Sequence, residues 1–200
     1  MIAQPDRIHL TPEEYLAAER DSPIKHEYHD GEVRAMAEAS DEHVTIAANL
    51  TALILPVARQ RGSRTYTSDM KVRVETQNRF YYPDLLVTCD SRDRDTRYYK
   101  QHPKLIVEIL SESTEAFDRG DKFQHYRQLE SLEEYVLVSQ THPAVDVFRR
   151  TGDRTWEFQP YIVGETVRFV SLELECAIAA IYEDVTFAPP ATEDSTEDAD

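Results

Sequence analysis

The chain has 200 residues, of which 40% are hydrophobic and 30% charged, a composition typical of a soluble globular protein. Its formal net charge of −16 argues against a tight, non-specific hold on nucleic acid, because proteins of that class carry a basic surface. No apolar run approaches the roughly 20 residues that span a bilayer, and the N-terminus lacks the layout of a signal peptide. We therefore expect a cytoplasmic protein without membrane contact.

Domain boundaries and cysteines give simple expectations. We expect residues 1–187 to form a single domain, and residues 188–200 to be a disordered tail, because that segment is acidic and has no large apolar side chain. Cys89 and Cys176 form no pattern typical of a disulfide framework or a metal site. Both have apolar neighbours in the sequence, so two buried free thiols are expected.

The N-terminal segment is predicted to form a helix and a hairpin. Thr11 is a good N-cap, Pro12 stands at the first helical position and Glu14 completes a capping box, so Leu10–Arg20 is predicted to be helical. Asp30 and Gly31 lie at the centre of Ile24–Met36, between two alternating segments. An Asp-Gly pair in that position indicates a two-residue hairpin turn.

Two polar residues in this region are candidates for a site. Glu27 lies on the first strand of the hairpin, where the alternative is an acid that simply faces water. Ser40–Arg61 is predicted to be a helix, with a capping serine, acids in the first turn and a broad apolar face. His43 lies in the first turn of this helix and is either a structural or exposed histidine or part of a site.

Three strands and a charged loop follow. The strands are predicted over Arg64–Glu75, Arg79–Cys89 and Lys104–Leu110. Pro83 in the second of them favours an edge or a strand-start position, because proline donates no hydrogen bond to a ladder. The loop Asp90–Gln101 is long, charged and without predicted secondary structure, which is more typical of a functional or mobile segment than of an idle one.

The C-terminal third is again mostly β. The expected elements are a strand over Glu134–Ser139, a hairpin of Ala144–Arg150 and Thr155–Tyr161, a short strand over Thr166–Val170 and a small helix over Leu174–Tyr182. The alternation of helices and strands along the whole chain predicts an α/β or α+β fold with a mixed sheet.

One acid interrupts a strand that is otherwise apolar. Glu108 lies within Lys104–Leu110, and an ionised carboxylate in a buried strand is costly unless it is paired or binds a metal. Asp84 also lies beside an apolar strand segment. If the two strands are neighbours, the carboxylates meet and form the hard-oxygen site that Mg²⁺ or Mn²⁺ prefers. The alternative is that Asp84 is a turn acid and Glu108 pairs with an arginine.

A helix is predicted after the Glu108 strand, and it carries a basic candidate. Asp118, Lys122 and Tyr126 are four residues apart and therefore share one helix face. A lysine near two metal-binding acids supplies positive charge where negative charge develops in a phosphoryl transition state. The alternative for this trio is an ordinary ion pair on the protein surface.

Several separate pieces of the chain resemble the Uma family of restriction-endonuclease-like proteins, within the PD-(D/E)XK nuclease superfamily. The pieces are residues 26–32, His43, residues 67–72, Pro83-Asp84, residues 107–114, Asp118, Lys122, Tyr126 and residues 133–139. The resemblance extends from about Thr11 to Phe148. It implies a restriction-endonuclease-like core, with a mixed central β-sheet flanked by helices, and divalent-metal-dependent cleavage of DNA.

The resemblance also implies roles for residues. Asp84 and Glu108 correspond to the two metal-binding acids, with the Ile109 carbonyl as a further ligand for Mg²⁺ or Mn²⁺. Leu110 stands where the superfamily usually has its lysine, so we expect Lys122 to replace that lysine from the adjacent helix. The expected accessory residues are Glu27, His43, Asp69, Asp118 and Tyr126. The expected contacts with DNA phosphates are Arg94, Arg97, Lys100 and Arg119.

Two functional hypotheses remain at this point. The first is a Mg²⁺-dependent endonuclease acting on DNA, for which a homodimer is expected by analogy with nucleases that cut two strands. The second is a catalytically silent protein that keeps the nuclease fold for binding or regulation. The acidic net charge favours the second, and the set of Asp84, Glu108 and Lys122 favours the first.

Overall fold

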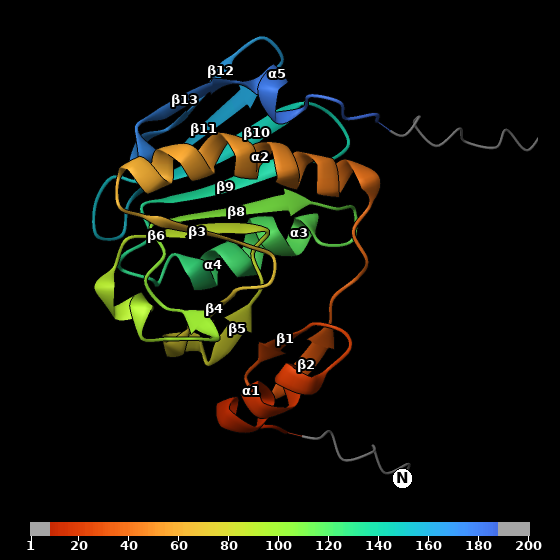
Figure 1. Ribbon diagram of the computed structural model, residues 1–200, viewed down its shortest axis with the longest axis vertical. Coiled ribbons are helices and arrows are strands. Elements are labelled where there is room, and N and C mark those ends of the chain that lie inside the picture. The colour runs from red at the N-terminus through yellow and green to blue at the C-terminus, as the bar shows by residue number, and fades with distance from the viewer. Residues whose placement is uncertain (1–8, 188–200) are drawn as a thin grey trace, which may run out of the picture.

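The computed structural model describes residues 9–187, which form three β-sheets and a few helices (Figure 1). The central sheet has six strands in the order β11-β10-β9-β8-β6-β3. It is mixed, because β8 and β9 are parallel and its other pairs are antiparallel. Its strands are β3 (Arg64–Thr67), β6 (Leu85–Thr88), β8 (Leu105–Leu110), β9 (Glu134–Ser139), β10 (Ala144–Arg150) and β11 (Trp156–Ile162). The predicted mixed central sheet is confirmed.

Helices cover both faces of this sheet (Figure 1). The long helix α2 (Asp41–Gln60) packs on one face. The other face carries α3 (Glu115–Phe117), a π-helical turn (Asp118–Lys122) and α4 (Phe123–Tyr126), which follow one another directly. Successive residues of β8 alternate between the two faces, so Glu108 shares the α4 face with its neighbours two residues away.

A second sheet holds the N-terminal hairpin, with strand order β2-β1-β5-β4-β7. Its strands are β1 (His26–His29), β2 (Glu32–Ala35), β4 (Lys71–Val74), β5 (Arg79–Tyr81) and β7 (Tyr99–Lys100), and α1 (Pro12–Asp21) packs beside β1. Asp30 and Gly31 both have positive φ angles, 49° and 99°, which a two-residue turn of this kind requires. The predicted hairpin and first helix are confirmed, and the helix has the expected capping box.

Two of the predicted strands are each divided between the two sheets. Arg64–Glu75 breaks into β3 and β4 at a turn in which the Met70 N–H donates to the Thr67 carbonyl. Arg79–Cys89 breaks into β5 and β6 around Pro83, whose nitrogen has no hydrogen to give to a ladder. The prediction of single strands is therefore wrong here, and the second break leaves Asp84 outside any strand.

The segment Asp90–Gln101 is also more ordered than predicted. It contains a 3₁₀ turn over Ser91–Arg94 and the short strand β7. Both are organised around the buried side chain of Asp93, which accepts hydrogen bonds from the Thr88 hydroxyl and from backbone N–H groups on the far side of the segment. A buried carboxylate satisfied by several donors fixes a long connection.

The remaining elements form a small C-terminal unit of β12 (Thr166–Phe169), β13 (Leu174–Ala177) and α5 (Ile178–Ile181). The helix predicted over Leu174–Tyr182 is therefore half wrong, because its first half pairs with β12 as a strand. Short apolar runs do not distinguish helix from strand by periodicity alone. Of the two cysteines, Cys176 is buried as predicted, whereas Cys89 is exposed, contrary to prediction, just beyond the end of β6.

Some expectations fall outside these observations. The tail, residues 188–200, lies outside the described residues, and the division into one domain and a tail stays a prediction. Within residues 9–187, every helix is too short or too polar to cross a bilayer.

Candidate active site

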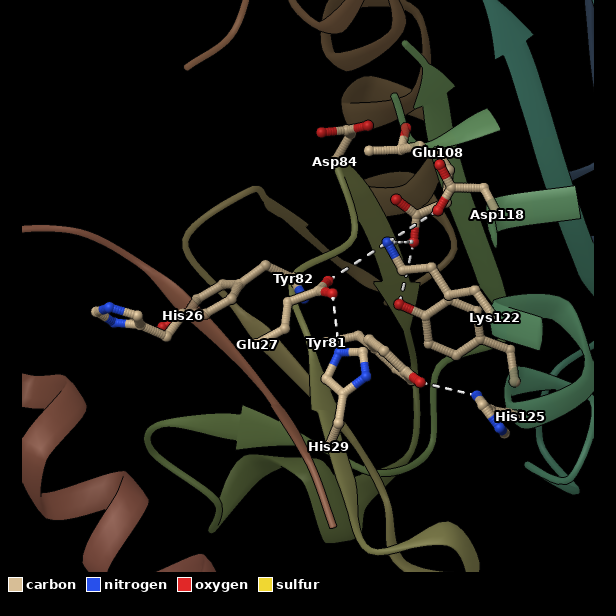
Figure 2. Close-up of polar contacts among 12 residues, drawn as sticks. His26, Glu27, His29, Tyr81, Tyr82, Asp84, Glu108, Asp118, Lys122 and His125 are labelled. Carbon is tan, nitrogen blue, oxygen red and sulfur yellow. Dashed lines mark hydrogen bonds and ion pairs between the residues drawn. The ribbon is translucent and has the colours of Figure 1, made fainter. Parts of the chain in front are cut away.

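The ammonium group of Lys122 lies among three carboxylates (Figure 2). Its Nζ atom is 3.0 Å from Glu108 Oε1 and 3.2 Å from Asp118 Oδ1. The third acid, Glu27, reaches the same atom from β1 at 3.4 Å. Lys122, Glu108 and Asp118 are only 6%, 3% and 2% exposed, so the group is a buried cluster and not a surface ion pair. Glu108 pairs with a lysine and not with an arginine.

Local structure explains how these side chains meet. Glu108 points to the α4 face by strand alternation, and the π turn carries Asp118 and Lys122 one above the other on the same face. The Tyr126 hydroxyl, one turn further on, donates a 3.1 Å hydrogen bond to Glu108 Oε1. Single π turns inside α-helices occur frequently at functional sites. The predicted grouping of Asp118, Lys122 and Tyr126 on one face is what the structure shows.

Asp84 approaches the cluster from the neighbouring strand. It directly precedes β6, which pairs with β8. Asp84 Oδ2 accepts a 2.7 Å hydrogen bond from the N–H of Ile109, the residue after Glu108. Asp84 Oδ1 lies 2.9 Å from Nε2 of His43 in the first turn of α2. Both carboxylate oxygens are thereby oriented, and His43 is brought to the site from the opposite face of the sheet.

Burial and the shared lysine shift the pKa values of Glu108 and Asp118 in opposite directions. Burial raises the pKa of Glu108 well above its ordinary value, Lys122 opposes the rise, and the charges of Asp118, Asp84 and Glu27 add to it. Burial likewise raises the pKa of Asp118, again against Lys122. The pKa of Lys122 is well above its ordinary value, because its acidic neighbours overcome the effect of burial. One lysine thus does not offset the burial of all its acidic neighbours, and the charged forms of Glu108 and Asp118 are disfavoured.

Glu27 behaves differently from the other acids. Burial acts against its charged form, yet Lys122 and His29 hold the pKa of Glu27 below its ordinary value. Its Oε1 accepts the Tyr82 N–H at 3.3 Å, and its Oε2 lies 3.4 Å from Nε2 of His29. Glu27 is thus not the solvated strand acid that was the alternative from sequence, and it ties the hairpin to the helix that carries Lys122.

The donor set has the chemistry of a divalent-cation site. The side-chain atoms around Lys122 are carboxylate oxygens, the ligands that Mg²⁺ and Mn²⁺ prefer. Asp118 Oδ1 is buried and accepts no hydrogen bond, although Lys122 is within ion-pair distance. Within residues 9–187, no three acidic, histidine or cysteine side chains are arranged to hold a metal by themselves. Mg²⁺ commonly takes only one or two carboxylates and completes its shell with water and substrate phosphate.

The remaining predicted site residues lie away from this cluster. Asp69 is 83% exposed at its side chain and pairs with Lys25. Arg119 pairs with Glu115 and Asp146 on the surface. Arg94 and Arg97 are exposed.

Lys100 requires a correction. Its side chain is buried, and its Nζ donates to the backbone carbonyls of Asp93 and Thr96. An amine buried among backbone carbonyls is not presented to a DNA phosphate on the surface, so the predicted contact is wrong. The length of the charged segment suggested exposure, whereas the buried Asp93 folds the segment inward.

Sequence reasoning missed an aromatic and histidine layer beneath the lysine (Figure 2). Lys122 Nζ lies 5.6 Å from the centre of the Tyr81 ring, within the range of a cation–π contact. The Tyr81 hydroxyl is 2.7 Å from Nδ1 of His125, and the His29 ring meets the Tyr81 ring edge to face. One signal was available, because His29 is two residues after Glu27 and shares its face of β1.

Comparisons with known proteins give the family. The sequence model of the family Uma2, described as "Putative restriction endonuclease", matches residues 12–180. Two proteins of Synechocystis sp. (strain ATCC 27184 / PCC 6803 / Kazusa) are similar. "Uncharacterized protein slr1290" is 36% identical over 89% of this chain and 94% of its own. "Uncharacterized protein sll1609" is 32% identical over 74% of this chain and 84% of its own.

A solved structure shows the same fold. It is the crystal structure of "a putative nuclease belonging to DUF820" from Anabaena variabilis ATCC 29413, with a TM-score of 0.71. The alignment covers 86% of this chain and 97% of the other, at 18% sequence identity. At that identity the likeness concerns the fold, and it agrees with the restriction-endonuclease-like core expected from the sequence.

Proposed function

This chain belongs to the Uma2 family of restriction-endonuclease-like proteins, and from that premise we propose that it hydrolyses DNA phosphodiester bonds with the help of a divalent cation. The observation that carries the proposal is the buried cluster of Glu27, Glu108 and Asp118 around Lys122, with Asp84 oriented beside it. Four acids and one lysine would destabilise a core that served structure alone, because each buried charge costs free energy unless it is compensated.

We assign the cation, Mg²⁺ or Mn²⁺, to Asp84, Glu108 and the backbone carbonyl of Ile109. When bound, such a cation neutralises phosphoryl oxygens and lowers the pKa of a coordinated water. In this assignment His43 and the Ile109 N–H orient the Asp84 carboxylate. Tyr126 likewise holds one oxygen of Glu108 in place.

Lys122 is the residue we assign to stabilisation of the transition state. A preorganised cation in a site of low dielectric stabilises the charge that develops on the phosphoryl group. Glu27 and Asp118 hold its amine at 3.4 Å and 3.2 Å, so the amine is positioned before any substrate arrives. These two acids are therefore positioning residues in the proposal, and Lys122 is the group that acts on the substrate.

A catalytically silent binding or regulatory protein is the second candidate. The observation that favours it is the position of the Lys122 amine, which already satisfies the acids as a set of three ion pairs. The formal net charge of −16 also weakens contact with a polyanion.

A plasmid-nicking assay tests the proposal. Purified protein is incubated with supercoiled plasmid and Mg²⁺ or Mn²⁺, beside Asp84→Asn and Glu108→Gln. We expect metal-dependent nicking by the wild type and a loss of about 10²-fold or more in either variant. Asp69→Asn is the matched control, because Asp69 carries the same carboxyl group in an exposed pair with Lys25. It should nick at the wild-type rate.

The same assay identifies the silent alternative. Absence of nicking by the wild type under both metals, together with DNA binding that Glu108→Gln leaves unchanged, would reject the enzyme and favour a binding protein. Nicking that survives in both acid variants would mean that the residues assigned here are wrong, whatever the reaction.

A further inference from the structure

A cavity of about 320 Å³ lies beyond the end of α4, away from the acid cluster. Arg127 follows α4 directly, Arg150 ends β10, Arg154 lies in the turn after it, and Trp156 begins β11. Strand β9 passes both the cavity and the acid cluster. Its first residue, Glu134, pairs with Arg149 beside the cavity, and Val138 pairs with Ile109 beside the cluster. These two positions are four residues apart, which is roughly 13 Å at 3.3 Å per residue.

Arg150 forms the rigid floor of this cavity. Its guanidinium donates to the carbonyls of Leu132, Asp153, Arg127 and Leu129 at 2.7–3.0 Å. Its Cζ lies 4.6 Å from the centre of the Trp156 ring. Four of its five N–H donors are thus used, and no carboxylate of the described residues forms an ion pair with it.

The two arginines at the rim, Arg127 and Arg154, lack partners of their own. Within residues 9–187 their side chains make no ion pair or hydrogen bond, whereas Arg61, Arg92 and Arg119 all pair with acids. Two acids, Glu130 and Asp153, also line the cavity. Three arginines against two acids leave a positive excess in a chain whose formal net charge is −16.

Trp156 adds an unused donor. In the described part of the chain its indole N–H is buried and has no acceptor. Buried donors are almost always satisfied, so an unpaired one requires an explanation. An anion in this cavity would accept hydrogen bonds from the guanidinium groups of Arg127 and Arg154, and Trp156 lines the same cavity.

We propose that this cavity binds a phosphate group, held by Arg127 and Arg154 above the Arg150–Trp156 floor. The guanidinium fork matches phosphate oxygens in a bidentate manner, which makes arginine well suited to this ligand. The same chemistry is offered by a phosphodiester of a nucleic acid and by free phosphate. Binding here does not depend on cleavage at the acid cluster, so the inference stands apart from the proposed enzymatic function.

The sole tryptophan of the chain, Trp156, reports directly on this cavity. The full chain, in chelator-treated metal-free buffer, is titrated with inorganic phosphate and, separately, with a short single-stranded oligonucleotide without terminal phosphates. Heat of binding and Trp156 emission are recorded together. We expect saturable heat with a matching change in emission for at least one ligand, and the arm that saturates at the lower concentration identifies the source of the phosphate.

Charge-neutralising variants make the test specific. Arg127→Gln and Arg154→Gln should each weaken binding roughly tenfold or more, because each removes charge-assisted hydrogen bonds. Arg59→Gln is the matched control, since Arg59 is exposed on α2 and its side chain makes no ion pair or hydrogen bond within residues 9–187. It should bind as the wild type does.

Two results would overturn the inference. One is the absence of saturable heat and of any emission change with both ligands up to millimolar concentrations. The other is equal weakening by Arg59→Gln and Arg154→Gln, which would indicate general electrostatic attraction rather than a site. Loss of nicking with intact phosphate binding would affect only the proposed nuclease.

Discussion

Glu27 and Glu108 share the Lys122 amine, yet the protein treats their charges in opposite ways. The pKa of Glu108 is raised, chiefly by complete burial, and neighbouring acids add to the rise. Lys122, His29 and a backbone N–H hold the pKa of Glu27 below its ordinary value in spite of burial. The ionised form of Glu27 therefore stabilises the fold, whereas the ionised form of Glu108 destabilises it. A destabilising group of this kind is expected where it is kept for function and not for stability.

We predict that Glu108→Gln stabilises the metal-free protein at pH 8. The unfolded chain loses this proton near pH 4.5, whereas the folded protein keeps it to higher pH. The stability from this group is therefore full below pH 4.5 and is lost as the pH rises. Glutamine does not titrate, so the variant avoids this loss of stability, and Lys122 keeps its ion pairs with Glu27 and Asp118.

Thermal unfolding measures the effect of this change. At pH 8 the variant should exceed the wild type by on the order of 1 kcal/mol, or about 2–4 °C in Tm. The gap should close toward pH 4.5. A variant that is less stable than the wild type at pH 8 would show that the ionised Glu108 contributes to folding, contrary to this reasoning.

Glu27→Gln should have the opposite effect. Its ionised form is favoured in the folded protein, so its contribution is present above pH 4.5 and lost as the pH falls through the lower folded pKa. Removing that charge should cost about 1.5–3 kcal/mol near pH 7, the range for hydrogen bonds to charged groups. Urea unfolding at pH 7 and pH 4 should show the deficit shrinking at the lower pH. A deficit that stays constant would point to packing instead of charge.

At the scale of elements, the π turn that carries Lys122 tolerates a stiffer backbone. Gly120 lies in this turn, and a Cβ added there meets no atom within 4 Å. Gly120→Ala should raise the free energy of unfolding by about 0.4–1 kcal/mol, because alanine restricts the unfolded chain.

Gly31→Ala is the contrasting change in the hairpin. Its φ of +99° is strained for alanine, and the new Cβ would lie 1.9 Å from the His9 ring. A loss of about 1–3 kcal/mol is expected in urea unfolding. If Gly120→Ala were as destabilising as Gly31→Ala, the π turn would not accept a Cβ, contrary to the open space around Gly120.

The elements also show what the sequence was able to predict. The run of apolar residues around Glu108 predicted both the buried strand and an acid that needs a partner, and the four-residue spacing predicted the face shared by Asp118 and Lys122. The break near Met70 was not predicted, because local alternation continues through it, whereas Pro83 indicated a strand start without indicating that the chain changes sheet there. The position of each break depends on how the two sheets pack against each other, which local sequence does not show.

At the scale of the whole molecule, contacts distant in sequence complete the site. Glu27 comes from an N-terminal hairpin in another sheet, and His43 reaches Asp84 from the helix on the opposite face. Neither partner follows from spacing along the chain, since each contact is set by how the sheets and helices pack. The family resemblance supplied their positions as candidates, whereas the residues alone left both open.

The proposed chemistry depends on a divalent cation bound by Asp84 and Glu108, and thermal unfolding with Mn²⁺ shows whether that cation binds. A ligand that binds only the folded protein adds about 2.7 kcal/mol of stability at one hundred times its Kd. We expect a saturable rise in Tm of several degrees for the wild type and for Asp69→Asn, and no rise for Glu108→Gln. An equal rise in Glu108→Gln, or none in the wild type, would mean that these acids do not form a cation site.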